Sequence, residues 1–190
     1  PPARPTSAAC AKGAISHRQS GMVRVKFTAH RKPVPPIRNR PNMKPIAIFR
    51  HTKTEGPGYF ATFLDLHSIP WQLIAIDQGE AVPDYADAFS GLCLMGGPMS
   101  VNDPLPWIES LCALIRDADA RGIPVIGHCL GGQLISKALG GRITRSPVKE
   151  IGWGNACAEN NDSARLWLHD YLEPGGVATV FQWHGETFSL

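Results

Sequence analysis

Apolar residues follow two alternating patterns from Met43 onward. Short apolar runs, which predict buried strands, are each followed by a longer stretch whose apolar positions recur every three or four residues, as on one face of a helix. This alternation is typical of a parallel α/β sheet. The predicted strands are 46–49, 73–76, 91–95 and 124–127, with further short candidates at 142–144 and 177–183, and the predicted helices are 59–68, 108–121 and 130–139. We therefore predict an α/β fold with a mostly parallel, twisted sheet and helices on both faces.

The first 42 residues follow neither pattern. They are rich in Pro and carry nine Lys or Arg with no acidic residue. A segment of this kind buries too little apolar area to offset its ordering entropy, so we expect residues 1–42 to be a disordered basic extension and 43–190 to be the folded domain. Three roles are open for the extension: an upstream segment without function, which we favour, an organelle transit peptide, or an arm that binds nucleic acid.

Charge and cysteine content narrow the class of protein. The net charge of +3 is the sum of +9 in residues 1–42 and −6 in residues 43–190, so the folded part is mildly acidic, which argues against nucleic acid as its ligand. The five cysteines have irregular spacing, without a CxxC pair or a zinc-type Cys/His cluster. We therefore expect reduced thiols, a cytoplasmic location and no metal or other cofactor. We also expect no membrane partner, because no apolar run is long enough to span a bilayer.

The strongest candidate for chemistry is Cys129. The apolar strand 124–127 runs into the segment Gly127–Gln133 (GHCLGGQ), which opens the predicted helix 130–139. Gly-x-Cys-x-Gly between a strand and a helix is the pattern of a nucleophile elbow with Cys in place of Ser. The positive end of the helix favours the Cys129 thiolate, and the amide of Leu130 is expected to point toward a developing oxyanion.

A second glycine turn, Gly96-Gly97-Pro98, follows the strand 91–95. In a parallel sheet this turn opens at the same edge as Cys129, where ligands of such folds bind. The backbone N–H of Gly96 or Gly97 is therefore a candidate for the second donor of an oxyanion hole.

These motifs carry a family resemblance. Gly127–Gln133 resembles the nucleophile motif of class I glutamine amidotransferases, although Gly132 stands where many relatives have His, and Gly96–Pro98 resembles their oxyanion loop. Lys149–Trp153 and Trp183–Phe188 resemble two further segments of the branch that includes the GMP synthase amidotransferase domain. The resemblance covers residues 43–190 and implies a flavodoxin-like class I glutamine amidotransferase architecture.

The resemblance also implies a reaction. The Cys129 thiolate attacks the side-chain amide of glutamine, ammonia leaves, and water releases glutamate from a γ-glutamyl thioester. Gln133 and the backbone at Gly97, Leu130 and Gly185 are implied to hold the substrate. The ammonia passes to a separate synthetase, or the enzyme simply hydrolyses γ-glutamyl compounds.

The proton-transfer residues are less clear. His184 and Glu186 form a His-x-Glu pattern, but the family's catalytic His-x-Glu sits further along the chain, so we expect His184 to border the pocket and the C-terminal part of the domain to be missing. A His184–Glu186 dyad remains the alternative. We expect His128 to point away from Cys129 and His51 to be a solvated loop residue. Two other functions stay open: a non-catalytic or truncated family member without the dyad, and a Cys-type α/β-hydrolase.

Overall fold

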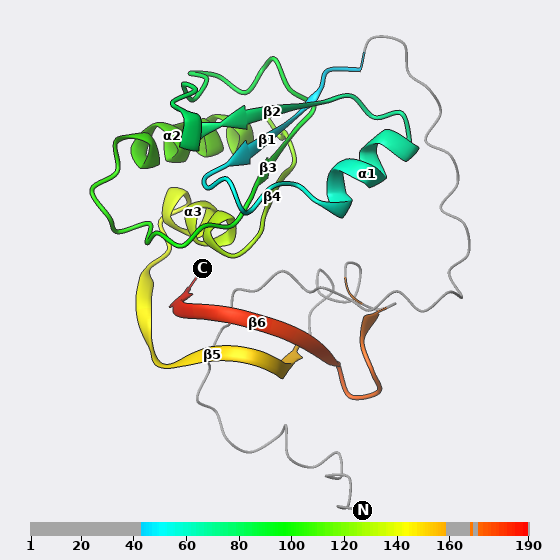
Figure 1. Ribbon diagram of the computed structural model, residues 1–190, viewed down its shortest axis with the longest axis vertical. Helices are drawn as coiled ribbons and strands as arrows, with labels where there is room; N and C mark the ends of the chain where they lie inside the picture. The colour runs from blue at the N-terminus through cyan, green and yellow to red at the C-terminus, as the bar shows by residue number, and fades with distance from the viewer. Residues whose placement is uncertain (1–42, 159–167, 169–170, 190) are drawn as a thin grey trace, which may run out of the picture.

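Four parallel strands form the centre of the molecule in the computed structural model, which describes residues 43–158, 168 and 171–189. The strands are β1 (Ile46–Arg50), β2 (Trp71–Ala75), β3 (Gly91–Leu94) and β4 (Val125–Gly127), in the order β2-β1-β3-β4. All three strand pairs are parallel. The connecting helices are α1 (Tyr59–Leu66), the short 3₁₀ helix η1 (Ile76–Gln78), α2 (Pro106–Ala120) and α3 (Leu130–Ala138), as Figure 1 shows.

Helices cover both faces of this sheet. On β1, Ala47 and Phe49 face the core that α2 and α3 close, whereas Ile48 faces the smaller core that α1 closes. The alternation follows from the two-residue period of a strand, and both faces are apolar because both are buried. The predicted α/β class, with a mostly parallel sheet between helices, is therefore confirmed.

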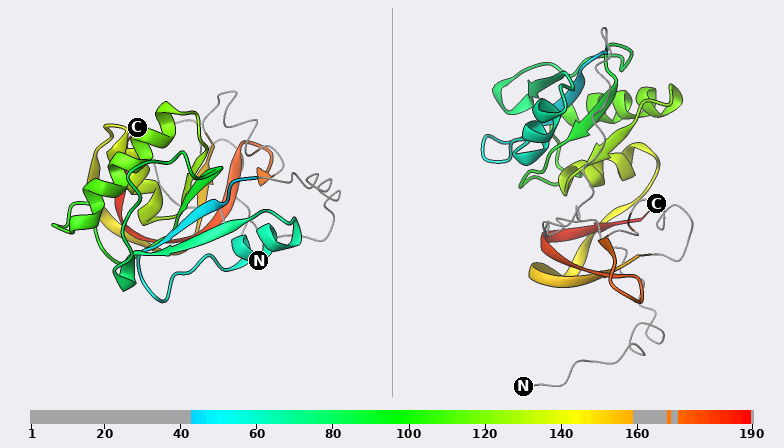
Figure 2. Two further views of the ribbon diagram at one scale, coloured as in Figure 1. Left: turned by 90° about the horizontal axis from the view of Figure 1, so that it is seen from above. Right: turned by 90° about the vertical axis from the view of Figure 1, so that its right-hand side faces the viewer.

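The last two strands differ from the prediction in length and partner. β5 (Ile143–Cys157) and β6 (Val177–Phe188) are long and pair with each other, antiparallel, in a sheet of their own. Pro147 and the glycines at 152 and 154 interrupt the strand pattern of β5, which is why only a short piece was predicted. The structure accommodates Pro147 in an irregular stretch between Arg145 and Glu150, where the register shifts. Figure 2 shows this hairpin as a separate layer beside the helices of the main sheet.

The hairpin has one covered and one open face. Ala178, Val180 and His184 of β6 are buried, whereas Trp183 is 69% exposed. Phe181 stacks edge-on against Trp153 of the partner strand, with ring centroids 5.4 Å apart. The open face therefore carries the cross-strand pair of Phe181 and Trp153, and aromatic pairs of this kind stabilise an antiparallel sheet.

Two further expectations concern membrane-spanning segments and residues 1–42. Within the described residues no helix has the length and apolar character needed to cross a membrane. The expectation for residues 1–42 falls outside the described part of the chain.

Candidate nucleophile site

Cys129 lies in a strained turn between β4 and α3. It immediately precedes the helix and has φ 51° and ψ −109°, a conformation that L-residues rarely adopt. Holding a non-glycine residue there costs about 1–3 kcal/mol and persists only where the surroundings over-determine it. The strain lifts the cysteine out of both the strand and the helix, as a nucleophile elbow requires.

Two glycines hold this turn in place, because they allow backbone segments to pack closely around it. A Cβ on Gly131 would overlap the backbone carbonyl of Leu94 in the neighbouring strand, and a Cβ on Gly127 would overlap the backbone of Gly131. The third glycine is different, because a Cβ on Gly132 would meet the ring of Phe188 at 3.6 Å and the carbonyl oxygen of Gly127 at 3.8 Å, both ordinary contact distances. The turn therefore needs glycine at positions 127 and 131, and position 132 has room for a side chain.

The glycine turn after β3 packs directly against the elbow. The position of a Cβ on Gly97 lies 2.9 Å from Cδ2 of Leu130 and 3.5 Å from Cβ of His51. The backbone N–H of His128 donates to the carbonyl of Leu94 at 2.9 Å, which continues the β3–β4 ladder into both turns. The structure thus brings Gly97 and Leu130 together at the carboxyl edge of the sheet.

The β5–β6 hairpin forms the opposite side of the site. The Cys129 sulfur lies 4.0 Å from the carbonyl oxygen of Trp183, and Nε2 of Gln133 donates to the carbonyl of Glu186 at 3.5 Å. Gln133 is only 5% exposed. The hairpin therefore places Gly185, which lies between these two contacts in the chain, beside Cys129 and Gln133.

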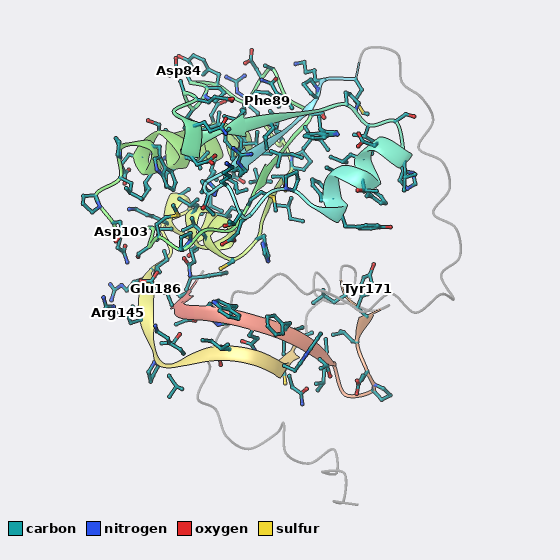
Figure 3. The ribbon with its side chains drawn as sticks, in the orientation of Figure 1. Asp84, Phe89, Asp103, Arg145, Tyr171 and Glu186 are labelled. Carbon is teal, nitrogen blue, oxygen red and sulfur yellow. The ribbon has the colours of Figure 1, made fainter. Side chains whose placement is uncertain are left out.

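His184 and Glu186 have different partners. Nε2 of His184 lies 2.7 Å from Oε2 of Glu150 across the hairpin, a contact with the distance of an ion pair but without the alignment of a hydrogen bond. The carboxylate of Glu186 accepts from the Ser100 hydroxyl at 2.9 and 3.0 Å. Figure 3 shows Glu186 beside Arg145 at the end of the hairpin. In this arrangement His184 and Glu186 do not form a His–Glu pair with each other.

The electrostatics of Cys129 differ from the expectation. Burial raises the pKa of the thiol, and the negative charge of Glu55 raises it further, against the opposing hydrogen bond from the backbone N–H of Leu130. The direction of this shift opposes the predicted thiolate character, because desolvation outweighs the effect of the helix terminus. The two buried thiols are less acidic than a free cysteine as well: burial raises the pKa of Cys93 to about 12 and also raises that of Cys112.

His51 is buried, so the expectation of a solvated loop residue is wrong. It is 3% exposed, its ring stacks on Trp107 with centroids 5.0 Å apart, and its Nδ1 lies 3.0 Å from the carbonyl oxygen of Met95. Burial lowers the pKa of His51, although the carbonyls of Met95 and Gly96 act in the other direction. The His51 ring thus supports the residues that lead into the Gly96–Gly97 turn.

Sequence reasoning overlooked Glu55. Its carboxylate lies against the Cα of Gly96, close enough that a Cβ there would overlap Oε2 of Glu55. The signal that could have found this residue is topological, since the loop after β1 opens at the same sheet edge as the elbow and the glycine turn. The described part of the chain holds no cluster of three or more His, Cys, Asp or Glu side chains arranged for a metal ion.

The burial of His51 predicts an acid-sensitive fold. Because the pKa of His51 is lower in the folded than in the unfolded chain, the unfolded chain binds the extra proton below the ordinary value of 6.5, and stability is lost as the pH falls. We expect the free energy of unfolding to fall by up to about 1.4 kcal/mol per pH unit from this residue. Urea unfolding of the wild type and of His51→Gln between about pH 5 and 8 measures the difference, and equal slopes would contradict it.

Fold and site together define an α/β protein with a cysteine in a strained strand-to-helix turn at the carboxyl edge of a parallel sheet. The family model described as glutamine amidotransferase class-I matches residues 64–190. The chain belongs to the class I glutamine amidotransferase family.

Individual relatives agree with this assignment. The chain is 41% identical over 126 residues to a putative glutamine amidotransferase-like protein, YfeJ, of Salmonella typhimurium, covering 63% of this chain and 50% of that protein. It is 29% identical over 136 residues to gamma-glutamyl peptidase 3 of Arabidopsis thaliana, covering 67% and 53%. A crystal structure of a glutamine amidotransferase from Methylobacillus flagellatus superimposes with a TM-score of 0.73 at 47% identity, over 78% of this chain and 58% of that one. The chain thus spans about half the length of the first two of these relatives.

Proposed function

We propose that Cys129 is the nucleophile of a γ-glutamyl amide hydrolysis. Its thiolate attacks the δ-carbonyl carbon of glutamine or of a related γ-glutamyl compound, forming a carbon–sulfur bond. The carbon–nitrogen bond then breaks, and ammonia or an amine leaves with the proton that the Cys129 thiol released on ionising. Water finally cleaves the γ-glutamyl thioester, which releases glutamate and restores the thiol.

The observation that carries this proposal is the elbow itself. Cys129 has a strained backbone next to the N-terminus of α3, and the N–H of Leu130 is directed at its sulfur. Gly97 packs against Leu130 from the neighbouring turn. An N–H from each of these two turns is the arrangement that stabilises the oxyanion of acyl transfer.

Substrate binding is assigned to the groups around the elbow. Gln133 has a side-chain amide with two donors and an acceptor, and it lies between α3 and the hairpin next to Gly185. We assign Gln133 and the backbone of Gly97, Leu130 and Gly185 to the glutamyl part of the substrate. The ammonia formed passes to a separate synthetase or to water.

His184 is assigned to the pocket wall. Its imidazole is buried against Glu150, and the acid two residues further on is held by Ser100. A general base needs a partner that orients it toward the nucleophile, and these contacts orient His184 toward β5 instead. In an active form of the domain, His184→Ala is therefore expected to weaken binding of the glutamyl group more than it slows the covalent step.

The family match sets aside the Cys-type α/β-hydrolase, so the remaining rival is a member that binds without reacting. A covalent label separates the two. We expect 6-diazo-5-oxo-L-norleucine, an electrophilic glutamine analogue, to add one adduct at Cys129 that glutamine suppresses. Mass spectrometry of the digested protein locates the adduct, with Cys157→Ser as the control because Cys157 is exposed and remote in sequence.

The labelling result decides between the two functions. An adduct lost in Cys129→Ala and retained in Cys157→Ser supports the nucleophile. Labelling that glutamine does not slow, or that follows Cys157, would leave the chain as a non-catalytic family member.

A further inference from the structure

We propose that the carboxylate of Glu55 binds the α-ammonium group of the γ-glutamyl substrate, so that the site selects compounds whose α-amino group is free and charged. This inference rests on the proposed function and adds a specificity-determining residue to it. It assigns the loop between β1 and α1 to substrate selection, although that loop lies outside the motifs that identified the nucleophile.

The position of Glu55 is the first observation. The residue follows β1 by a short turn, closed by the hydrogen bond from its own N–H to the carbonyl of Thr52 at 3.1 Å. This turn lays the half-buried carboxylate over Gly96, the first residue of the glycine turn that packs beside Leu130. Glu55 is thus held at the rim of the site by backbone structure.

The missing counter-charge is the second observation. Within residues 43–158, 168 and 171–189, the Glu55 carboxylate has no hydrogen bond or ion pair, whereas other acids of the domain, such as Asp77 with Arg50 and Asp117 with Arg121, do. A half-buried carboxylate without a partner is partly desolvated and gains little in return. The Glu55 carboxylate is therefore suited to bind a positively charged group of a ligand.

The negative charge of Glu55 lies where it opposes the proposed reaction. Glu55 interacts electrostatically with Cys129, and the negative charge opposes formation of the thiolate. The same charge lies beside the glycine turn where an oxyanion would develop, and a like charge there opposes it too. A cation bound to Glu55 cancels both effects, so a substrate that brings its own positive charge also makes the nucleophile easier to ionise.

The chemistry of γ-glutamyl compounds supplies such a cation. Their reacting carbon and their α-nitrogen are joined by four bonds, a reach of about 5 Å when extended, since each bond is about 1.5 Å long. The α-ammonium is the only positive group of glutamine and of a γ-glutamyl peptide's first residue. A carboxylate at the rim of the site therefore distinguishes a free α-amino group from an acylated one.

His128 is a basic side chain of the protein that also approaches Gly96. Its Nδ1 lies 3.5 Å from the same Gly96 position that Glu55 approaches. If a protonated His128 were the true partner of Glu55, the carboxylate would have no preference for the substrate's ammonium. The experiment therefore compares reagents rather than pH values.

Two electrophiles that differ only at the α-nitrogen test the proposal: 6-diazo-5-oxo-L-norleucine and its N-acetyl derivative. Both are applied to the full chain carrying Cys10→Ser and Cys157→Ser, so that labelling reports Cys129. Iodoacetamide serves as a third reagent that needs no glutamyl recognition. The variants are Glu55→Gln, Glu55→Asp and the matched control Glu109→Gln, whose carboxylate is on the surface of α2.

We expect the free amine to label Cys129 about tenfold faster, or more, than the N-acetyl reagent, as a charge-assisted hydrogen bond provides. Glu55→Gln should reduce this preference to near unity and speed up iodoacetamide labelling, since the opposing charge is gone. Glu55→Asp should give an intermediate preference, and Glu109→Gln should match the parent protein.

Several outcomes would overturn the proposal. One is a preference for the free-amine reagent over the N-acetyl reagent that survives in Glu55→Gln. Another is a Glu55→Gln variant in which both diazoketones label Cys129 equally more slowly, which would make Glu55 a proton carrier. If Cys129 reacts with iodoacetamide but with neither diazoketone, the proposed function itself fails and the role of Glu55 with it. Thermal unfolding of each variant shows whether the fold is intact, and Glu55→Asp keeps the test valid if Glu55→Gln does not fold.

Discussion

Replacing Gly131 by alanine is expected to destroy the elbow and most of the stability of the domain. The added methyl would occupy the space of the Leu94 carbonyl group in β3, and backbone cannot move aside as a flexible side chain can. Overpacking of this kind is among the few mechanisms that cost more than about 4 kcal/mol, a large share of the total stability of a domain. Denaturant unfolding and the rate of Cys129 labelling measure both consequences.

The chain provides a matched control one residue further on. Gly132 lies in the same helical turn, but a Cβ there meets the Phe188 ring and the Gly127 carbonyl oxygen at ordinary contact distances. Gly132→Ala should leave labelling unchanged and raise the free energy of unfolding by up to about 1 kcal/mol, because alanine favours the helix over glycine. Similar losses in both variants would show that the close approach of α3 to β3 is not what positions the nucleophile.

Cys129→Gly is expected to abolish covalent labelling and at the same time to stabilise the fold. Cys129 is held at φ 51° and ψ −109°, which glycine adopts without strain and other residues do not. Relief of this strain should make Cys129→Gly about 1 kcal/mol more stable than Cys129→Ala, which keeps the Cβ and therefore the strain.

The comparison with alanine separates strain from side-chain loss. Both variants lack the sulfur, so their difference in urea midpoint reports the backbone alone. A Cys129→Gly protein less stable than Cys129→Ala would mean that the turn is relaxed and that the chain-entropy cost of glycine dominates. Either way neither variant should form an adduct with the diazoketone.

The sequence predicted the parts of the fold that repeat a simple period. The ends of the strands from Ile46 to Gly127 and of the three helices differ by only a few residues from those expected, but β4, which was predicted to be buried, lies at the end of the strand order and its Ile126 is 41% exposed. The elbow was also predictable, because a strained strand-to-helix turn requires glycines at fixed positions around Cys129.

The remaining features depend on contacts between distant segments. The length of β5 was missed because Pro147 breaks the local pattern, while pairing with β6 holds the strand together on both sides of the irregularity. Burial of His51 results from its stacking on Trp107 of α2, which no local pattern encodes. The raised pKa of Cys129 likewise comes from desolvation and from Glu55, a residue in a loop that the motifs do not include.

The bond between Ser100 and Glu186 has a consequence for the order of folding. It joins positions 86 residues apart in the chain, and the entropy cost of closing so long a loop must be met before the bond forms. Because the contacts of the β3–β4–α3 unit are closer in sequence, we expect this unit to form before the hairpin closes over it, and we expect the hairpin to be among the first parts to open. Until the hairpin closes, the sulfur of Cys129 is exposed to small electrophiles, because the carbonyl of Trp183 that lies 4.0 Å from it belongs to that hairpin.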